Sequence, residues 1–136
     1  MSRRQTRSEA REGAFSLVFQ LNTDNIDIEF LIEQLTEEKP ESVYNIEYIK
    51  TVIYGVVEKT NELDERISAA LPSNRGITRI SKVVLAVLRL AVYEILYVDD
   101  VPEKVAINEA VELAKKYGED DAPSFVNGVL SGVVSR

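Results

Sequence analysis

The stretch SKVVLAVLRLAVYEILY, residues 81–97, decides the fold class of this chain. Its apolar side chains recur at intervals of three and four and cover most of the circumference of a helix, as expected at the centre of a helical domain. The most apolar part, residues 83–92, is shorter than the roughly 20 residues that span a bilayer, and Arg89 interrupts it. The sequence therefore predicts a buried core helix and no membrane span.

Helical periodicity continues on both sides of this stretch, without the strict alternation typical of strands. Caps, prolines and glycines bound further helices at about residues 7–21, 28–38, 43–71 and 102–116, and a short turn at 77–80. Asp99 or Asp100 can cap the helix at Pro102, and Asp120 or Asp121 opens a last helix that ends near residue 134. The break PSNRG, residues 72–76, divides the chain. We predict one all-α domain of six or seven helices, with an N-terminal half of about 1–72 and a C-terminal half of about 77–136.

The composition argues against catalysis. The 136 residues include no cysteine and no histidine, which removes thiolate chemistry, the commonest general base and the commonest metal ligands. Glu109 and Glu112 share a helical face, but the histidine that normally completes a di-metal bundle is absent, so we expect a solvated face. We expect neither an enzyme nor a metal or cofactor site. Residues 1–12 do not read as a secretory signal, so a cytoplasmic location is expected.

Charge is distributed unevenly along the chain. The net charge of −7 by itself argues against a nucleic-acid partner. Residues 1–12 are nevertheless net basic, because four arginines there outnumber Glu9 and Glu12. An acidic body with a basic N-terminal arm indicates a local nucleic-acid contact and a second, basic partner elsewhere.

The first predicted helix combines arginines with aromatic residues. At 100° per residue, Arg4, Arg7 and Arg11 fall within about 60° of one another, and Phe15 and Phe19 continue the ridge. Arginines bind phosphates, and aromatic faces accept unstacked bases. The spacing also fits a solvated arginine face beside core phenylalanines, so the pattern alone leaves both interpretations open.

Three sequence runs resemble the transcription antitermination factor NusB family. Residues 101–118, VPEKVAINEAVELAKKYG, with FVNGVL at 125–130, resemble its C-terminal signature. VLRLAVYEIL at 87–96 resembles the preceding helix, and RSEAREGA at 7–14 resembles the opening helix. The resemblance implies two small helical bundles packed together. It also implies binding of the boxA element of ribosomal RNA leaders together with NusE, a small-subunit ribosomal protein, in the antitermination complex of RNA polymerase.

The resemblance also assigns roles to individual residues. Arg7 and Arg11 belong to the RNA-binding helix, and Phe19 matches an aromatic position beside the RNA. Asp121 matches an acidic position at the NusE interface. The full set of RNA contacts that it implies is Arg3, Arg4, Arg7, Arg11, Phe19, Phe125 and Asn127.

Departures from the family pattern keep alternatives open. Ser8 and Glu9 replace arginines of some relatives, which would weaken RNA binding by the protein alone. Val84 and Leu85 replace a charged pair, and if exposed they would favour the homodimer that some members form. One rival interpretation is a helical adaptor or dimerisation module without RNA binding. Another is the NusB-like domain that precedes the catalytic domain in some ribosomal RNA cytosine methyltransferases. The sequence to Arg136 contains no cofactor-binding βαβ unit, so we do not favour this one.

Overall fold

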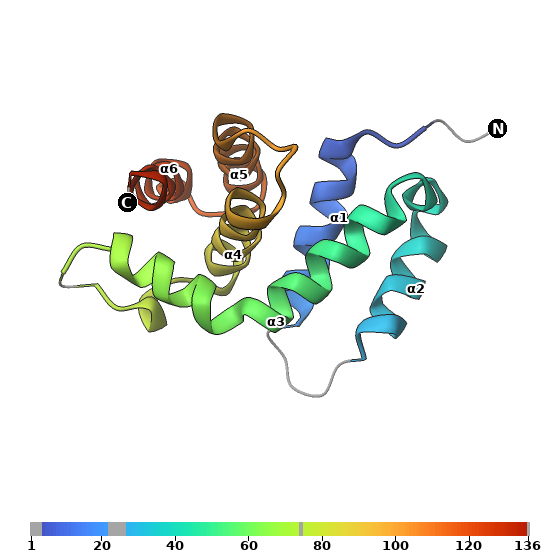
Figure 1. Cartoon of the computed structure of the whole chain (residues 1–136), viewed down its shortest axis with the longest axis horizontal. Coiled ribbons are helices and arrows are strands. Elements are labelled where there is room, and N and C mark those ends of the chain that lie inside the picture. The colour runs from blue at the N-terminus through green and yellow to red at the C-terminus, as the bar shows by residue number, and fades with distance from the viewer. Residues whose placement is uncertain (1–3, 22–26, 74, 136) are drawn as a thin grey trace.

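The computed structural model describes residues 4–21, 27–73 and 75–135. These residues form six α-helices, two short 3-10 helices and no strand (Figure 1), which confirms the all-α prediction. The elements in chain order are α1 (Arg7–Gln20), α2 (Ile28–Glu38), η1 (Pro40–Asn45), α3 (Ile46–Ala70), η2 (Ile77–Arg79), α4 (Lys82–Tyr97), α5 (Glu103–Tyr117) and α6 (Ala122–Val134).

Local sequence signals explain where the helices start. Thr6 and Glu9 form a capping box at the start of α1: the Thr6 side chain accepts from the Glu9 amide at 3.1 Å, and a Glu9 oxygen accepts from the Thr6 amide at 2.9 Å. Ser81 caps α4 in the same way by accepting from the Val84 amide. Such caps satisfy amide donors that the first turn leaves unpaired.

Two boundary predictions were wrong. The helix expected from residue 43 begins at Ile46, because Pro40–Asn45 forms a separate 3-10 turn. Neither Asp99 nor Asp100 caps α5; Pro102 occupies the cap position without a side-chain hydrogen bond. Proline fixes a backbone angle suited to a helix start, so this end needs no acidic cap.

The helix of residues 81–97 is the centre of the molecule, as its periodicity predicted. α4 packs against α1, α3, α5 and α6. Leu88 and Val92 are fully buried in one continuous core. Val84 is also buried and Leu85 is half-buried, so the two do not form the exposed apolar pair that would favour a homodimer on this face.

The arrangement of the helices separates the two ends of the fold. In Figure 1, α1 and α2 lie on one side, α6 lies on the other, and α4 and α5 stand between them. The long helix α3 contacts both groups. It packs against α1, and near its end Ala70 packs closely on α6, where a Cβ built on Gly132 would lie 3.2 Å from the Cβ of Ala70. The division into two halves at residues 72–76 therefore stays a prediction, with α3 shared between them. None of the described helices is both long and apolar enough to cross a membrane.

Candidate nucleic-acid interface

Two exposed arginines lie against two tyrosines where α1 begins. The Arg7 guanidinium lies 4.3 Å from the centroid of the Tyr48 ring, and that of Arg4 lies 5.9 Å from the Tyr44 ring. Both arginines and Tyr44 are exposed, whereas Tyr48 is buried. Stacking on the rings orients the guanidinium groups and leaves their charge available to an anion. These four residues are called the arginine–tyrosine patch below.

Polar contacts fix the segment before α1 against η1. The Asn45 side-chain amide donates to the backbone oxygen of Gln5 at 3.2 Å, while its oxygen accepts from Arg7 Nε at 3.3 Å. The buried Gln5 side chain reaches Ser42 at 3.4 Å. Beside these residues lies a groove of about 430 Å³, whose far wall includes Asp100, Pro102 and Val105. The two arginines of the patch thus line a groove on a fixed scaffold.

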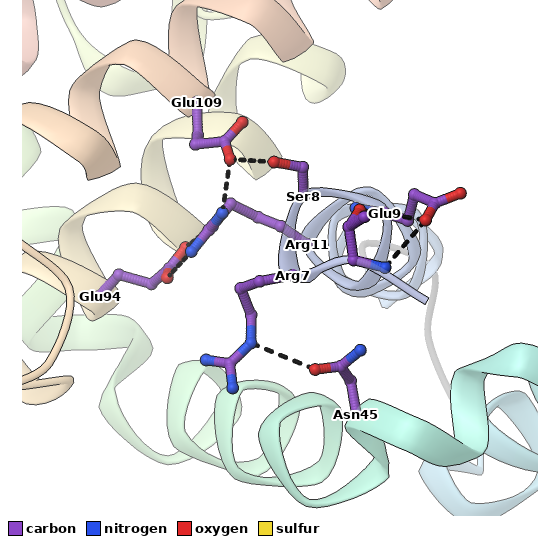
Figure 2. A network of polar contacts seen from close by, with 8 residues as sticks. Arg7, Ser8, Glu9, Arg11, Asn45, Glu94 and Glu109 are labelled. Carbon is purple, nitrogen blue, oxygen red and sulfur yellow. Dashed lines mark hydrogen bonds and ion pairs between the residues drawn. The ribbon is translucent and has the colours of Figure 1, made fainter. Parts of the chain in front are cut away.

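Arg11 lies one turn further along α1 and has a different environment. Figure 2 shows its guanidinium between two carboxylates. It donates to Glu94 at 2.7 and 2.9 Å and to Glu109 at 2.8 Å. The Arg11 residue is 4% exposed and Glu94 is fully buried. The Ser8 hydroxyl donates to the same oxygen of Glu109.

The charge of Arg11 is compensated inside the protein. Burial acts to lower the pKa of Arg11, but hydrogen bonding to Glu94 and the nearby negative charges outweigh it and raise that pKa. Burial, followed by the charge of Glu94, raises the pKa of Tyr48. A phosphate contact by Arg11 would have to use the two N–H donors that Glu94 and Glu109 leave free, on a residue that is buried and already paired. The geometry therefore weighs against the predicted RNA contact of Arg11, which stays a prediction.

Phe19 lies at the opposite end of α1 from the arginine–tyrosine patch. Twelve residues separate it from Arg7, which corresponds to about 18 Å along the helix axis. Its ring is exposed, whereas Phe15, predicted on the same ridge, is buried. Phe15 is therefore a core residue, whereas Phe19 lies at the surface, and its RNA contact stays a prediction.

The remaining predicted site residues lie on or just before α6, away from α1. Asp121 is exposed at the cap position of α6, without a side-chain cap hydrogen bond. Phe125 is half-buried, and the Arg75 guanidinium lies 4.8 Å from its ring centroid. Asp121, Arg75 and Phe125 line a cavity of about 170 Å³. Asn127 is exposed two residues after Phe125, about 200° around the helix, and so faces another direction. Arg3 lies outside the described residues.

The sequence interpretation missed the partners of these arginines. Apart from their spacing of four, nothing in the sequence marks Tyr44 and Tyr48 as partners of the arginines. The prediction that Glu109 lies on a solvated face was wrong, because Glu109 binds Arg11 and Ser8. On α4, Arg89 pairs with Asp64 at 2.8 Å and Glu94 pairs with Arg11.

The fold and this surface define a small all-α protein that presents stacked arginine side chains on an otherwise acidic body. Residues 8–135 match the family described as the NusB family. The chain belongs to the NusB family.

Known relatives cover nearly the whole chain. It is 43% identical over 130 residues to the transcription antitermination protein NusB of Bacillus subtilis, covering 95% of each chain. It is 45% identical over 127 residues to the protein of that name from Ruminiclostridium cellulolyticum, covering 93% of this chain and 87% of the relative. The solved structure of NusB from T. maritima superposes with a TM-score of 0.85 at 33% identity, covering 98% of this chain and 94% of the other. A NusB solved with NusE and double-stranded RNA superposes with a TM-score of 0.82 at 28% identity, covering 95% and 96%.

Proposed function

We propose that the protein is a transcription antitermination factor that binds boxA-type single-stranded RNA of ribosomal RNA leaders together with the ribosomal protein NusE. The family supports this role, and a relative with the same fold has been solved with NusE and double-stranded RNA. The observation that carries the RNA part is the arginine–tyrosine patch, where Arg4 and Arg7 stack on tyrosine rings at the surface. Neither arginine forms an ion pair with another described residue within 4.0 Å.

In this proposal the arginine–tyrosine patch binds RNA through electrostatic contacts, and the protein catalyses no reaction. Arg4 and Arg7 contact phosphates, which gives affinity that falls as the salt concentration rises. Arg11 holds α1 against α4 and α5 through Glu94 and Glu109. The acidic remainder of the chain is complementary in charge to a basic ribosomal protein, and Asp121 is the proposed contact with NusE. In the cytoplasm, this assembly of protein, NusE and RNA acts on RNA polymerase.

Reversing the charge of Arg7 should weaken RNA binding without unfolding the protein. Arg7 is exposed at the first position of α1, where a glutamate is compatible with the helix dipole. We expect Arg7→Glu to raise the Kd for a labelled boxA-type RNA about tenfold or more. Because one phosphate contact of a single strand is lost, the slope of log K against log salt should decrease in magnitude by about 0.7. Fluorescence anisotropy at several salt concentrations, with and without NusE, measures both quantities.

The matched control is Lys82→Glu, which makes the same charge change at an exposed position in the first turn of α4. It should leave Kd within about twofold and the salt slope unchanged. If Arg7→Glu and Lys82→Glu have equal effects, the patch is not an RNA contact. If the wild-type protein shows no salt-dependent RNA binding with or without NusE, the alternative of a helical adaptor or dimerisation module replaces the proposal.

A further inference from the structure

Tyr117, the last residue of α5, lies between two separate groups of proposed RNA contacts. One group, Arg4, Arg7 and Phe19, lies on or just before α1, and the other, Phe125 and Asn127, lies on α6. In Figure 1, α5 stands between α1 and α6. The end of α5 therefore lies on a path that a continuous strand of RNA touching both groups can follow.

An aromatic cluster joins Tyr117 to α1. The Tyr117 ring centroid is 5.1 Å from that of Phe15, and Phe15 is 6.5 Å from Phe19. Phe15 is buried, whereas Phe19 and Tyr117 are 39% and 44% exposed. The two exposed rings, called the Phe19–Tyr117 platform, are therefore braced from below by a core residue.

Hydrogen bonds hold the Tyr117 ring in place. Its hydroxyl donates to Glu12 at 2.9 Å, and the Lys116 ammonium donates to both oxygens of Glu12 at 2.7 and 2.8 Å. Burial of Glu12 acts to raise its pKa, but the bonds from Lys116 and Tyr117 outweigh it and lower that pKa, so the carboxylate is ionised at neutral pH. A ring fixed in advance loses little conformational entropy when a ligand stacks on it.

The turn after Tyr117 keeps the platform close to the start of α6. A Cβ on Gly118 would lie 2.7 Å from Ala122 Cβ and 2.9 Å from the Ala114 carbonyl oxygen, so only glycine fits this tight turn. Asp121 follows Tyr117 by four residues, which limits their Cα separation to about 15 Å. The turn thus joins Tyr117 closely to α6, which carries the second group of proposed contacts.

We propose that Phe19 and Tyr117 form a stacking platform for the bases of single-stranded RNA, and that Tyr117 is a direct RNA contact. This inference rests on the proposed function and adds a subsite to it. Exposed aromatic rings accept any base on their π-faces. Lys115 and Lys116 lie beside the platform, where they pair with Glu112 and Glu12. The platform therefore supplies affinity that depends on stacking and not on salt.

The test compares Tyr117→Leu, which removes the ring but keeps apolar bulk over Phe15, with Tyr117→Phe, which keeps the ring and loses the hydroxyl. Anisotropy with boxA-type RNA should show binding weakened about fivefold or more for Tyr117→Leu, with an unchanged salt slope. Tyr117→Phe should remain within about twofold of wild type. Equal affinity of Tyr117→Leu and wild type would overturn the inference while leaving the effect of Arg7→Glu, and hence the proposed function, intact.

Two further measurements distinguish a lost stacking contact from a misfolded variant or a damaged NusE interface. Photo-cross-linking of wild-type protein to RNA that carries 4-thiouridine should give adducts at Phe19 or Tyr117, which does not depend on the folding of any variant. Binding of NusE without RNA should be the same for Tyr117→Leu and wild type. Adducts confined to other residues would overturn the inference. A loss of NusE binding by Tyr117→Leu would also overturn it, because the two rings would then be covered by NusE and not by RNA.

Discussion

Replacement of Arg11 by alanine is expected to lower the free energy of unfolding by about 3–5 kcal/mol. Removal of the guanidinium leaves the carboxylate of Glu94, which is fully buried, without its two hydrogen bonds at 2.7 and 2.9 Å. An uncompensated buried charge costs more than the lost ion pair itself, because water cannot replace the partner. Urea denaturation measures the change, and the melting temperature should fall by roughly 10–20 °C.

The control for Arg11→Ala is a double substitution that removes both charges. Arg11→Met with Glu94→Leu replaces the buried pair by apolar side chains and should recover most of the lost stability. Glu109 tolerates the loss of Arg11, since its side chain is 24% exposed and can be hydrated. A loss below about 1 kcal/mol for Arg11→Ala, as expected of a surface ion pair, would contradict the buried network.

Gly55→Val is expected to cost about 3 kcal/mol or more, because α3 approaches Tyr93 of α4 too closely for any side chain at this position. A Cβ built on Gly55 would lie 2.2 Å from Tyr93 Cζ and 2.3 Å from its hydroxyl oxygen. The Tyr93 ring is buried and packs against Tyr97 at 5.3 Å, so it has to be displaced. Overpacking of this kind costs more than the modest helix propensity that a non-glycine residue gains. Thermal and urea unfolding of the variant measure the loss.

A double-mutant cycle identifies the cause of the Gly55→Val effect. Tyr93→Ala opens the space that the valine side chain needs. Tyr93→Ala should therefore lower the free energy of unfolding much less in the Gly55→Val background than in the wild-type protein. Additive losses would show that the ring is not what excludes a side chain at residue 55. Gly132→Val is a useful comparison, since a Cβ there meets Ala70 at the milder distance of 3.2 Å.

Much of the fold could be predicted from local sequence. Helical periodicity is a property of neighbouring residues, so α1 and α4 were predicted almost to the residue. The prediction failed where local alternatives compete, as in the 3-10 turn before Ile46. The family was likewise visible in the runs at residues 101–118 and 125–130, and the matching relatives confirm it.

The candidate site could be predicted only in part, because a helix position fixes direction but not surroundings. Arg7 and Arg11 share one face of α1, and the sequence treats them alike. In the folded chain, Arg7 remains at the surface on Tyr48, whereas Arg11 meets two glutamates that are 83 and 98 residues away. The Tyr117 ring reaches Phe15 from another helix in the same way.

The amino-acid sequence by itself determined the helical class, the central place of residues 81–97, the absence of cysteine and histidine chemistry, and the family. The first three follow from composition and from patterns within one or two helical turns, and the family follows from the matching sequence runs. The tertiary structure decided which arginines face solvent and which are neutralised inside, and which aromatic rings are exposed together. Burial and ion pairing depend on the residues that distant helices bring to the same place, and no local pattern specifies them.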